Sequence, residues 1–262
     1  EIDMELLDKA VLRVLTAKFR MGLFENPYAL AGEELKEAVC QEKDREISLQ
    51  SAKESLVLLK NNGVLPLKGD KKKIALIGPH ADCARKFFGG YTHMCMMEST
   101  YAIANSIAGV SGVVQADADK IKTIPGTNIQ SDETEEFDAI LHRQKPECRS
   151  LLEEMRSRMP ETEIRYAYGY PIAGADESRF EEALLAVKEA DVVILTIGGK
   201  HGTCSMASMG EGVDACNINL PPCQEAFIRK AAEFGKPLIG VHFDGRPVSS
   251  DTADACLDAL LE

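Results

Sequence analysis

The chain has 262 residues, of which 45% are hydrophobic, and a formal net charge of -12, a composition typical of a globular protein and not of a disordered one. Its 42 acidic and 30 basic residues argue against a nucleic-acid binder, which would present a basic face to the phosphates. We expect no membrane segment, because no apolar run reaches about 18 residues.

Two helices are predicted in the first part of the chain. Apolar residues recur at helical spacing over residues 3–22 and again from Ile47 to Leu59, where Asn61-Asn62-Gly63 follows as a cap. The residues between them are turn-rich and then charged, as in a linker. The sequence starts without a signal-peptide pattern and stops within an expected helix, Ala253–Leu261. We therefore expect a piece of a longer chain.

Runs that are apolar on both faces predict central parallel strands, covered by helices on both sides. These strands are Lys73–Gly78, Glu163–Ala167, Asp191–Ile197 and Pro237–Val241. Helical patterns lie between them, at Glu147–Met159, Ser178–Ala190 and Pro222–Phe234. Tyr101–Ile107 also reads as a helix, and Thr123–Thr134 as a turn region. The alternation predicts an α/β fold with a doubly wound, mostly parallel sheet flanked by helices, an α/β sandwich of the flavodoxin-like kind.

Ligands of such sheets meet the loops at the carboxyl ends of the strands. The loop Gly198–Leu220 is the longest and least regular of these, and it places Glu211 between two glycines. A carboxyl group in a cleft can act as a general acid when burial raises its pKa. The alternative is a solvated loop glutamate. Asp214 is a second acid, a loop-organising acceptor, or neither.

Other chemistries find little support. Gly78-Pro79-His80 follows a strand but lacks the glycine spacing of a nucleotide loop, and no histidine has a serine or cysteine partner at motif spacing. The eight cysteines form no CxxC and have no histidine at zinc-ligand spacing, so we expect free thiols, no metal and no cofactor. Free thiols favour a cytoplasmic over a secreted location. Cys204, Cys216 and Cys223 cluster near the long loop.

Several segments in order resemble the carboxyl-terminal α/β domain of glycoside hydrolase family 3. They cover nearly the whole chain, with residues 100–146 the least matched. The residues that carry the resemblance are Ala17–Tyr28, Glu54–Asn61, Lys73–Pro79, Gly89-Gly90-Tyr91, Ala190–Ile194, Gly210-Glu211-Gly212-Val213-Asp214, Leu220-Pro221 with Gln224, Gly235–Ile239 and Asp244-Gly245-Arg246-Pro247-Val248.

The resemblance implies a division of the chain. Residues 1–23 are similar to the last helix of a preceding (β/α)8 barrel that is absent here, residues 24–46 form a linker, and residues 47–262 form the α/β sandwich, truncated at its end. The family retains configuration when it cleaves terminal β-glycosidic bonds, with an aspartate nucleophile on the barrel. The partners implied are a β-glycoside or oligosaccharide substrate and the protein's own barrel, with no nucleic acid or membrane.

The resemblance also implies roles for single residues. Glu211 matches the general acid/base of the family's glucosidase and xylosidase branch, while Lys200, His201 and Asp214 are substrate-loop candidates. Ala215 departs from the pattern, because the family has an arginine there that helps to order the loop. Without a nucleophile the chain alone is expected to be inactive. The alternative is a non-catalytic flavodoxin-like module that binds a small ligand or a protein, although such a module has no need of the barrel-exit helix.

Overall fold

The computed structural model describes residues 3–39, 41–69, 72–106, 122–131, 135–203 and 207–262. The chain divides into two compact units, Glu1–Leu56 and Val57–Glu262. None of the helices in the described part has both the length and the apolar character needed to cross a membrane. Cys40, Cys204 and Ile107 lie outside the described residues.

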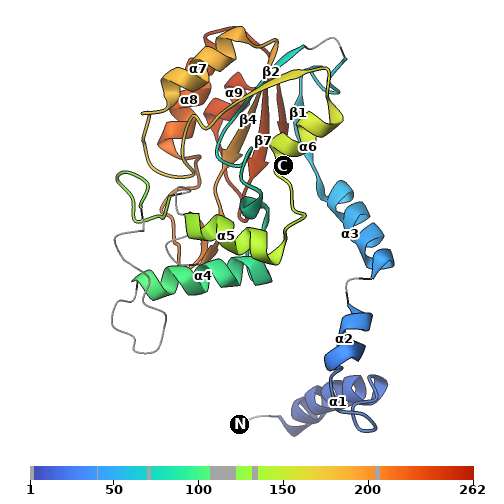
Figure 1. Cartoon of the computed structure of the whole chain (residues 1–262). Helices are drawn as coiled ribbons and strands as arrows, with labels where there is room; N and C mark the ends of the chain where they lie inside the picture. Colours follow the sequence, from blue (N-terminus) through green and yellow to red (C-terminus); the bar gives the residue numbers. More distant parts are fainter. Residues whose placement is uncertain (1–2, 40, 70–71, 107–121, 132–134, 204–206) are drawn as a thin grey trace. The chain divides into compact units, whose positions relative to one another are not determined.

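The first unit contains three helices, α1 (Met4–Arg20), α2 (Gly32–Ala38) and α3 (Glu42–Ser55), as Figure 1 shows. The helix predicted over residues 3–22 is confirmed as α1, and the Asp3 side chain caps it by accepting a hydrogen bond from the backbone N–H of Glu5. None of the three helices has a buried residue. The apolar side chains of α1 remain exposed, with Leu12 65% and Phe19 61% accessible.

Two predicted helix ends were wrong, and both errors concern the same pair of strands. The helix predicted over Ile47–Leu59 ends at Ser55, and Leu58–Asn61 forms strand β1. The helix predicted over Ala253–Leu261 is only α9 (Asp251–Cys256), followed by β8 (Ala259–Leu261). The two strands pair antiparallel, although they lie at opposite ends of the sequence of the second unit. Short apolar runs fit either structure, and only this distant pairing decides between them.

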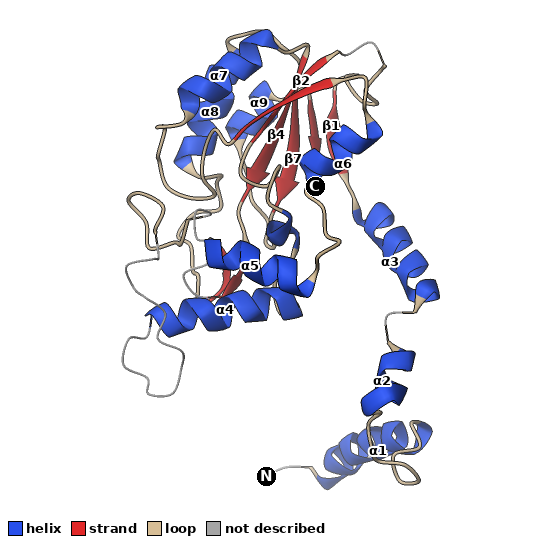
Figure 2. Cartoon of the chain, in the orientation of Figure 1, coloured by secondary structure: helices blue, strands red, loops and turns tan. Residues whose placement is uncertain are grey.

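The second unit is built on a six-stranded sheet in the order β1-β8-β7-β4-β2-β3. Its inner strands are β8, β7 (Leu238–Phe243), β4 (Val192–Gly198) and β2 (Lys73–Ile77), and its edges are β1 and β3 (Glu163–Ala167). All neighbours are parallel except β1 and β8. The mostly parallel, helix-flanked sheet that the sequence predicts is therefore confirmed (Figure 2).

Helices cover both faces of the sheet because its strands are apolar on both sides. On one face, Ala75 and Ile77 of β2 belong to a core with α7 (Phe180–Glu189), α8 (Pro222–Ala232) and α9. On the other face, Ile74 and Leu76 pack in a second core with α6 (Leu151–Arg158). This alternation follows from the two-residue period of a strand.

Further elements lie beyond the carboxyl ends of the strands, below the arrowheads of β4 and β7 in Figure 2. They are the 3-10 helix η1 (Ala84–Phe87), α4 (His93–Ser106), α5 (Glu135–Gln144) and a two-stranded sheet of β5 (His201–Thr203) and β6 (Met209–Glu211). Met94, Cys95 and Phe137 form the core between η1, α4 and α5. The described part of Thr123–Thr134 contains a Thr123–Gln130 bridge and no helix. This layer forms around the edge where the sequence predicts a site.

Candidate active site

Glu211 ends β6, which pairs in parallel with β5, so that Glu211 lies opposite Thr203. Its side chain is exposed, and its carboxylate accepts a hydrogen bond from the hydroxyl of Tyr91. That bond and the nearby negative charge of Glu211 raise the pKa of Tyr91. The carboxyl group is thus presented to solvent at the carboxyl edge of the main sheet, with a phenol beside it.

The two glycines that flank Glu211 have different tasks. Gly210 has φ +128°, and a Cβ placed on it would lie 2.0 Å from the carbonyl oxygen of Gly202 in β5. Only glycine therefore lets β6 approach β5 at this point. Gly212 has φ +71°, but a Cβ there would meet no atom within 4 Å. Gly210 is fixed by a close contact between two strands, and Gly212 by turn geometry alone.

The residues that follow β7 contact the Glu211 loop and hold it in place. The backbone N–H of Gly245 points to the sulfur of Met209 at 3.2 Å, and Arg246 Nη1 donates to the carbonyl of Val213 at 3.2 Å. The loop is therefore held on both sides of Glu211 by residues other than Ala215. Sequence reasoning recorded Asp244-Gly245-Arg246 as part of a pattern but assigned it no role.

His201 lies at the start of β5 and fastens two loops. Its Nδ1 accepts a hydrogen bond of 2.7 Å from the backbone N–H of Gly90, next to Tyr91. Its ring lies so close to Gly245 that a Cβ there would be 2.2 Å from His201 Cδ2. The imidazole thus joins the loop that carries Tyr91 to the segment that supports Glu211.

Lys200 is buried beside η1 and α4 and is not presented at the surface, since its side chain is 0% accessible. Its Nζ lies 3.3 Å from Glu98 Oε2 and donates to the carbonyl of Phe88 at 2.8 Å. Arg85 lies 3.6 Å from the other carboxylate oxygen of Glu98. Burial lowers the pKa of Lys200, and the charge of Glu98 opposes that shift. This network joins the end of β4 to η1 and α4.

Asp214 and the cysteines that lie near it in the sequence do not share one environment in the structure. Asp214 and Cys216 are exposed on the loop after Glu211, whereas Cys223 is buried in α8, where burial raises its pKa to about 12. Cys204 lies outside the described residues. The six cysteines of the described part that are free thiols are Cys83, Cys95, Cys148, Cys216, Cys223 and Cys256.

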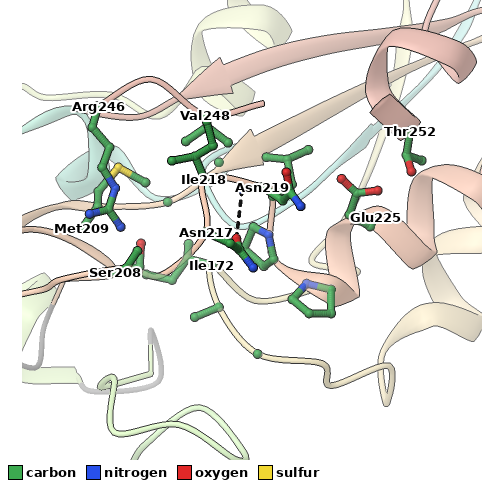
Figure 3. A pocket seen from close by; sticks show the side chains of 18 of the residues that line it. Ile172, Ser208, Met209, Asn217, Ile218, Asn219, Glu225, Arg246, Val248 and Thr252 are labelled. Carbon is green, nitrogen blue, oxygen red and sulfur yellow. Dashed lines mark hydrogen bonds between the residues drawn. The ribbon is translucent and has the colours of Figure 1, made fainter. Parts of the chain in front are cut away.

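A pocket of about 690 Å³ is lined by Gly198, by residues of the loop 215–222 and by the starts of α8 and α9 (Figure 3). Asn217, Asn219 and Arg246 line it, with the Asn217 side chain accepting a hydrogen bond from the backbone N–H of Asn219 at 3.0 Å. Glu225 accepts a hydrogen bond from Arg229 at 3.2 Å, and both residues line the pocket. Glu211 is not among the lining residues, so this pocket lies apart from the candidate acid.

Comparison with known families gives one match over most of the chain. A family model for the "Glycosyl hydrolase family 3 C-terminal domain" matches residues 56–262. That start agrees with the second compact unit, which begins at Val57. The domain boundary expected at residue 47 stays a prediction.

The curated relatives are longer enzymes. A beta-xylosidase of Formosa agariphila is 29% identical over 263 residues, covering 99% of this chain and 29% of that protein. A periplasmic beta-glucosidase of Salmonella typhimurium is 30% identical over 267 residues, covering 100% of this chain and 31% of that protein. The chain therefore spans less than a third of either relative.

Solved structures agree with the curated relatives. The GH3 exo-beta-xylosidase XlnD, in complex with a xylobiose aziridine activity-based probe, is 27% identical with a TM-score of 0.55, over 84% of this chain and 21% of that one. The beta-glucosidase of Listeria innocua, in complex with gluconolactone, is 25% identical with a TM-score of 0.57, over 100% of this chain and 28% of that one.

Proposed function

The chain belongs to glycoside hydrolase family 3, as its C-terminal domain, and from this premise we propose that Glu211 is the general acid/base of a retaining, exo-acting β-glycosidase. The observation that carries this proposal is the exposed Glu211 carboxyl on the β5–β6 sheet, held beside the Tyr91 hydroxyl. The names of the relatives favour a terminal β-glucoside or β-xyloside as substrate.

The proposed reaction uses Glu211 twice. A carboxylate nucleophile attacks the anomeric carbon, the bond to the leaving oxygen breaks, and the Glu211 proton moves to that oxygen. In the second step Glu211 takes a proton from water, the water oxygen bonds to the anomeric carbon, and the bond to the nucleophile breaks. Retention needs the two carboxyl groups about 5–5.5 Å apart. The loop must therefore reach the nucleophile of a second domain.

We assign that second domain to a preceding barrel, of which residues 1–23 are the last helix and residues 24–46 the linker. The apolar side chains of α1 support this assignment, since Leu6, Leu12 and Phe19 are all more than 60% exposed within their own unit. An amphipathic helix gains most of its stability by burying such a stripe against a partner. Lacking the nucleophile, the 262-residue chain is expected to hydrolyse no glycoside by itself.

Turnover of the complete enzyme tests the role of Glu211. We expect Glu211→Ala to slow hydrolysis of a substrate with a poor leaving group by about 10²–10⁴-fold, since positioned acid–base groups contribute that much. An aryl glycoside whose phenol leaves without protonation should lose much less in its first step. Glu181→Ala is the control, because it removes an exposed carboxylate on α7, away from the Glu211 loop, and it should turn over as the unaltered enzyme does. Equal rates for Glu211→Ala and the unaltered enzyme would contradict the assignment.

A further inference from the structure

A group of three ligand-type side chains lies at the carboxyl edge of the main sheet, apart from Glu211. Strands β7 and β8 run parallel with Val241 opposite Leu261, so the next residues, His242 within β7 and Glu262 just after β8, lie side by side. Asp244 is two residues beyond His242, which places it on the same face of an extended chain. The three side chains converge because β8 pairs with β7, not because they are close in sequence.

The distances among these atoms suit a shared ligand. His242 Nε2 lies 3.1 Å from Asp244 Oδ2, and both lie within 4.8 Å of a carboxylate oxygen of Glu262. Atoms that bind one tetrahedral Zn²⁺ at about 2.0–2.2 Å are themselves roughly 3.3 Å apart. The ring of His242 is also confined, since a Cβ on Gly198 would lie 3.1 Å from its Cδ2.

Burial distinguishes this group from an ordinary surface cluster. The side chains of His242 and Asp244 are only 7% and 5% accessible. Yet His242 Nε2 and Asp244 Oδ2 are buried without a hydrogen bond of acceptable geometry. Buried polar atoms are nearly always satisfied, so two such atoms 3.1 Å apart indicate a missing shared partner. Glu262, the third member of the group, is exposed.

We propose that His242, Asp244 and Glu262 bind one divalent transition-metal ion, with Zn²⁺ the best match. An imidazole nitrogen with two carboxylate oxygens suits Zn²⁺ and its first-row neighbours, whereas Ca²⁺ and Mg²⁺ prefer oxygen ligands alone. Sequence reasoning predicted no metal because it considered only ligand spacings within single motifs. The site stands independently of the role assigned to Glu211.

The site would have a structural consequence. Asp244 comes directly before Gly245 and Arg246, whose contacts with Met209 and Val213 hold the Glu211 loop. An ion that fixes Asp244 therefore fixes the start of that support. Ligands that bind only the folded state also raise its stability, so the ion should raise the melting temperature.

Zinc titration of the 262-residue chain, stripped with a chelator, tests the site by competition with a chromophoric chelator. We expect one Zn²⁺ per chain, with affinity reduced at least about tenfold in His242→Asn and in Glu262→Gln. His142→Asn is the matched control, because His142 is an exposed histidine on α5, and it should bind as the unaltered chain does. Circular dichroism checks folding, and Glu262→Gln decides if His242→Asn does not fold. Absence of binding by the unaltered chain, or undiminished binding by either variant, would overturn the proposal and leave a His242–Asp244 ion pair.

Discussion

Replacing Gly210 by alanine should damage catalysis far more than the same change at Gly212. The added methyl at position 210 would lie 2.0 Å from the carbonyl oxygen of Gly202, well inside any van der Waals contact, at a φ of +128°. Strands β5 and β6 must then separate or twist. The methyl at position 212 meets no atom within 4 Å, so its cost is mainly that of a left-handed alanine, roughly 1–2 kcal/mol.

The magnitude for activity follows from how far Glu211 must move. Relief of a 2.0 Å contact to the 3.0 Å or more that real Cβ atoms show requires a shift on the order of 1 Å in the backbone next to the carboxyl group. A misplacement of that size costs about 10²-fold in rate. We therefore expect Gly210→Ala to lose about 10²-fold in turnover of the complete enzyme, and Gly212→Ala to lose severalfold at most.

Two assays separate this effect from general unfolding. Turnover of a β-glycoside with a poor leaving group by the complete enzyme measures the displacement of Glu211, and thermal denaturation measures the stability of each variant. Both variants are expected to remain folded, because β5 and β6 lie outside the main sheet. Equal turnover of the two alanine variants would refute the argument that the β5–β6 approach positions Glu211.

Three further predictions concern the residues around this loop. Arg246→Ala should lower kcat of the complete enzyme while leaving the melting temperature of the domain nearly unchanged, since it removes the 3.2 Å bond to Val213; an unaltered kcat would show that the loop is held by other contacts. Lys200→Met should destabilise the chain by about 3 kcal/mol, because it breaks a buried charge network and leaves the Glu98 carboxylate without one of its cations. The melting temperature should then fall by roughly 6–12 °C. A fall under about 2 °C would contradict the view that this network stabilises the fold. Mass spectrometry after iodoacetamide at pH 8 should find Cys216 alkylated and Cys223 intact until the chain is denatured, because the thiolate reacts and the Cys223 pKa is about 12; alkylation of folded Cys223 at a comparable rate would contradict its burial.

The central strands could be predicted because their signal is local. β2 and β4 are apolar on both faces, and that pattern is typical of a buried parallel strand in any context. β1 and β8 could not, because a segment of three or four residues becomes a strand only through its partner. Leu58 and Leu261 pair across more than two hundred residues of chain, and no periodicity records this.

The candidate site likewise contains features with a local sequence signal and features that depend on distant segments. The two glycines that flank Glu211, both with positive φ, single it out in the sequence, but its role as acid/base comes from the family resemblance and stays a prediction. Its neighbour Tyr91 is 120 residues away, and the burial of Lys200 depends on Glu98 and Arg85 from other segments. Charged side chains are usually exposed, so nothing local in the sequence indicates that Lys200, a substrate-loop candidate, is buried. The His242–Glu262 pair depends on β8, which the sequence predicted as helix.

The product formed by the Glu211→Ala enzyme in azide tests the central claim most directly. Small anions need no proton removal, so azide can attack the glycosyl-enzyme where water no longer can. We expect azide to accelerate this variant, to leave the unaltered enzyme unaffected, and to yield a β-configured glycosyl azide that NMR identifies. No acceleration and no glycosyl azide from the variant would contradict the assignment of Glu211 as the acid/base.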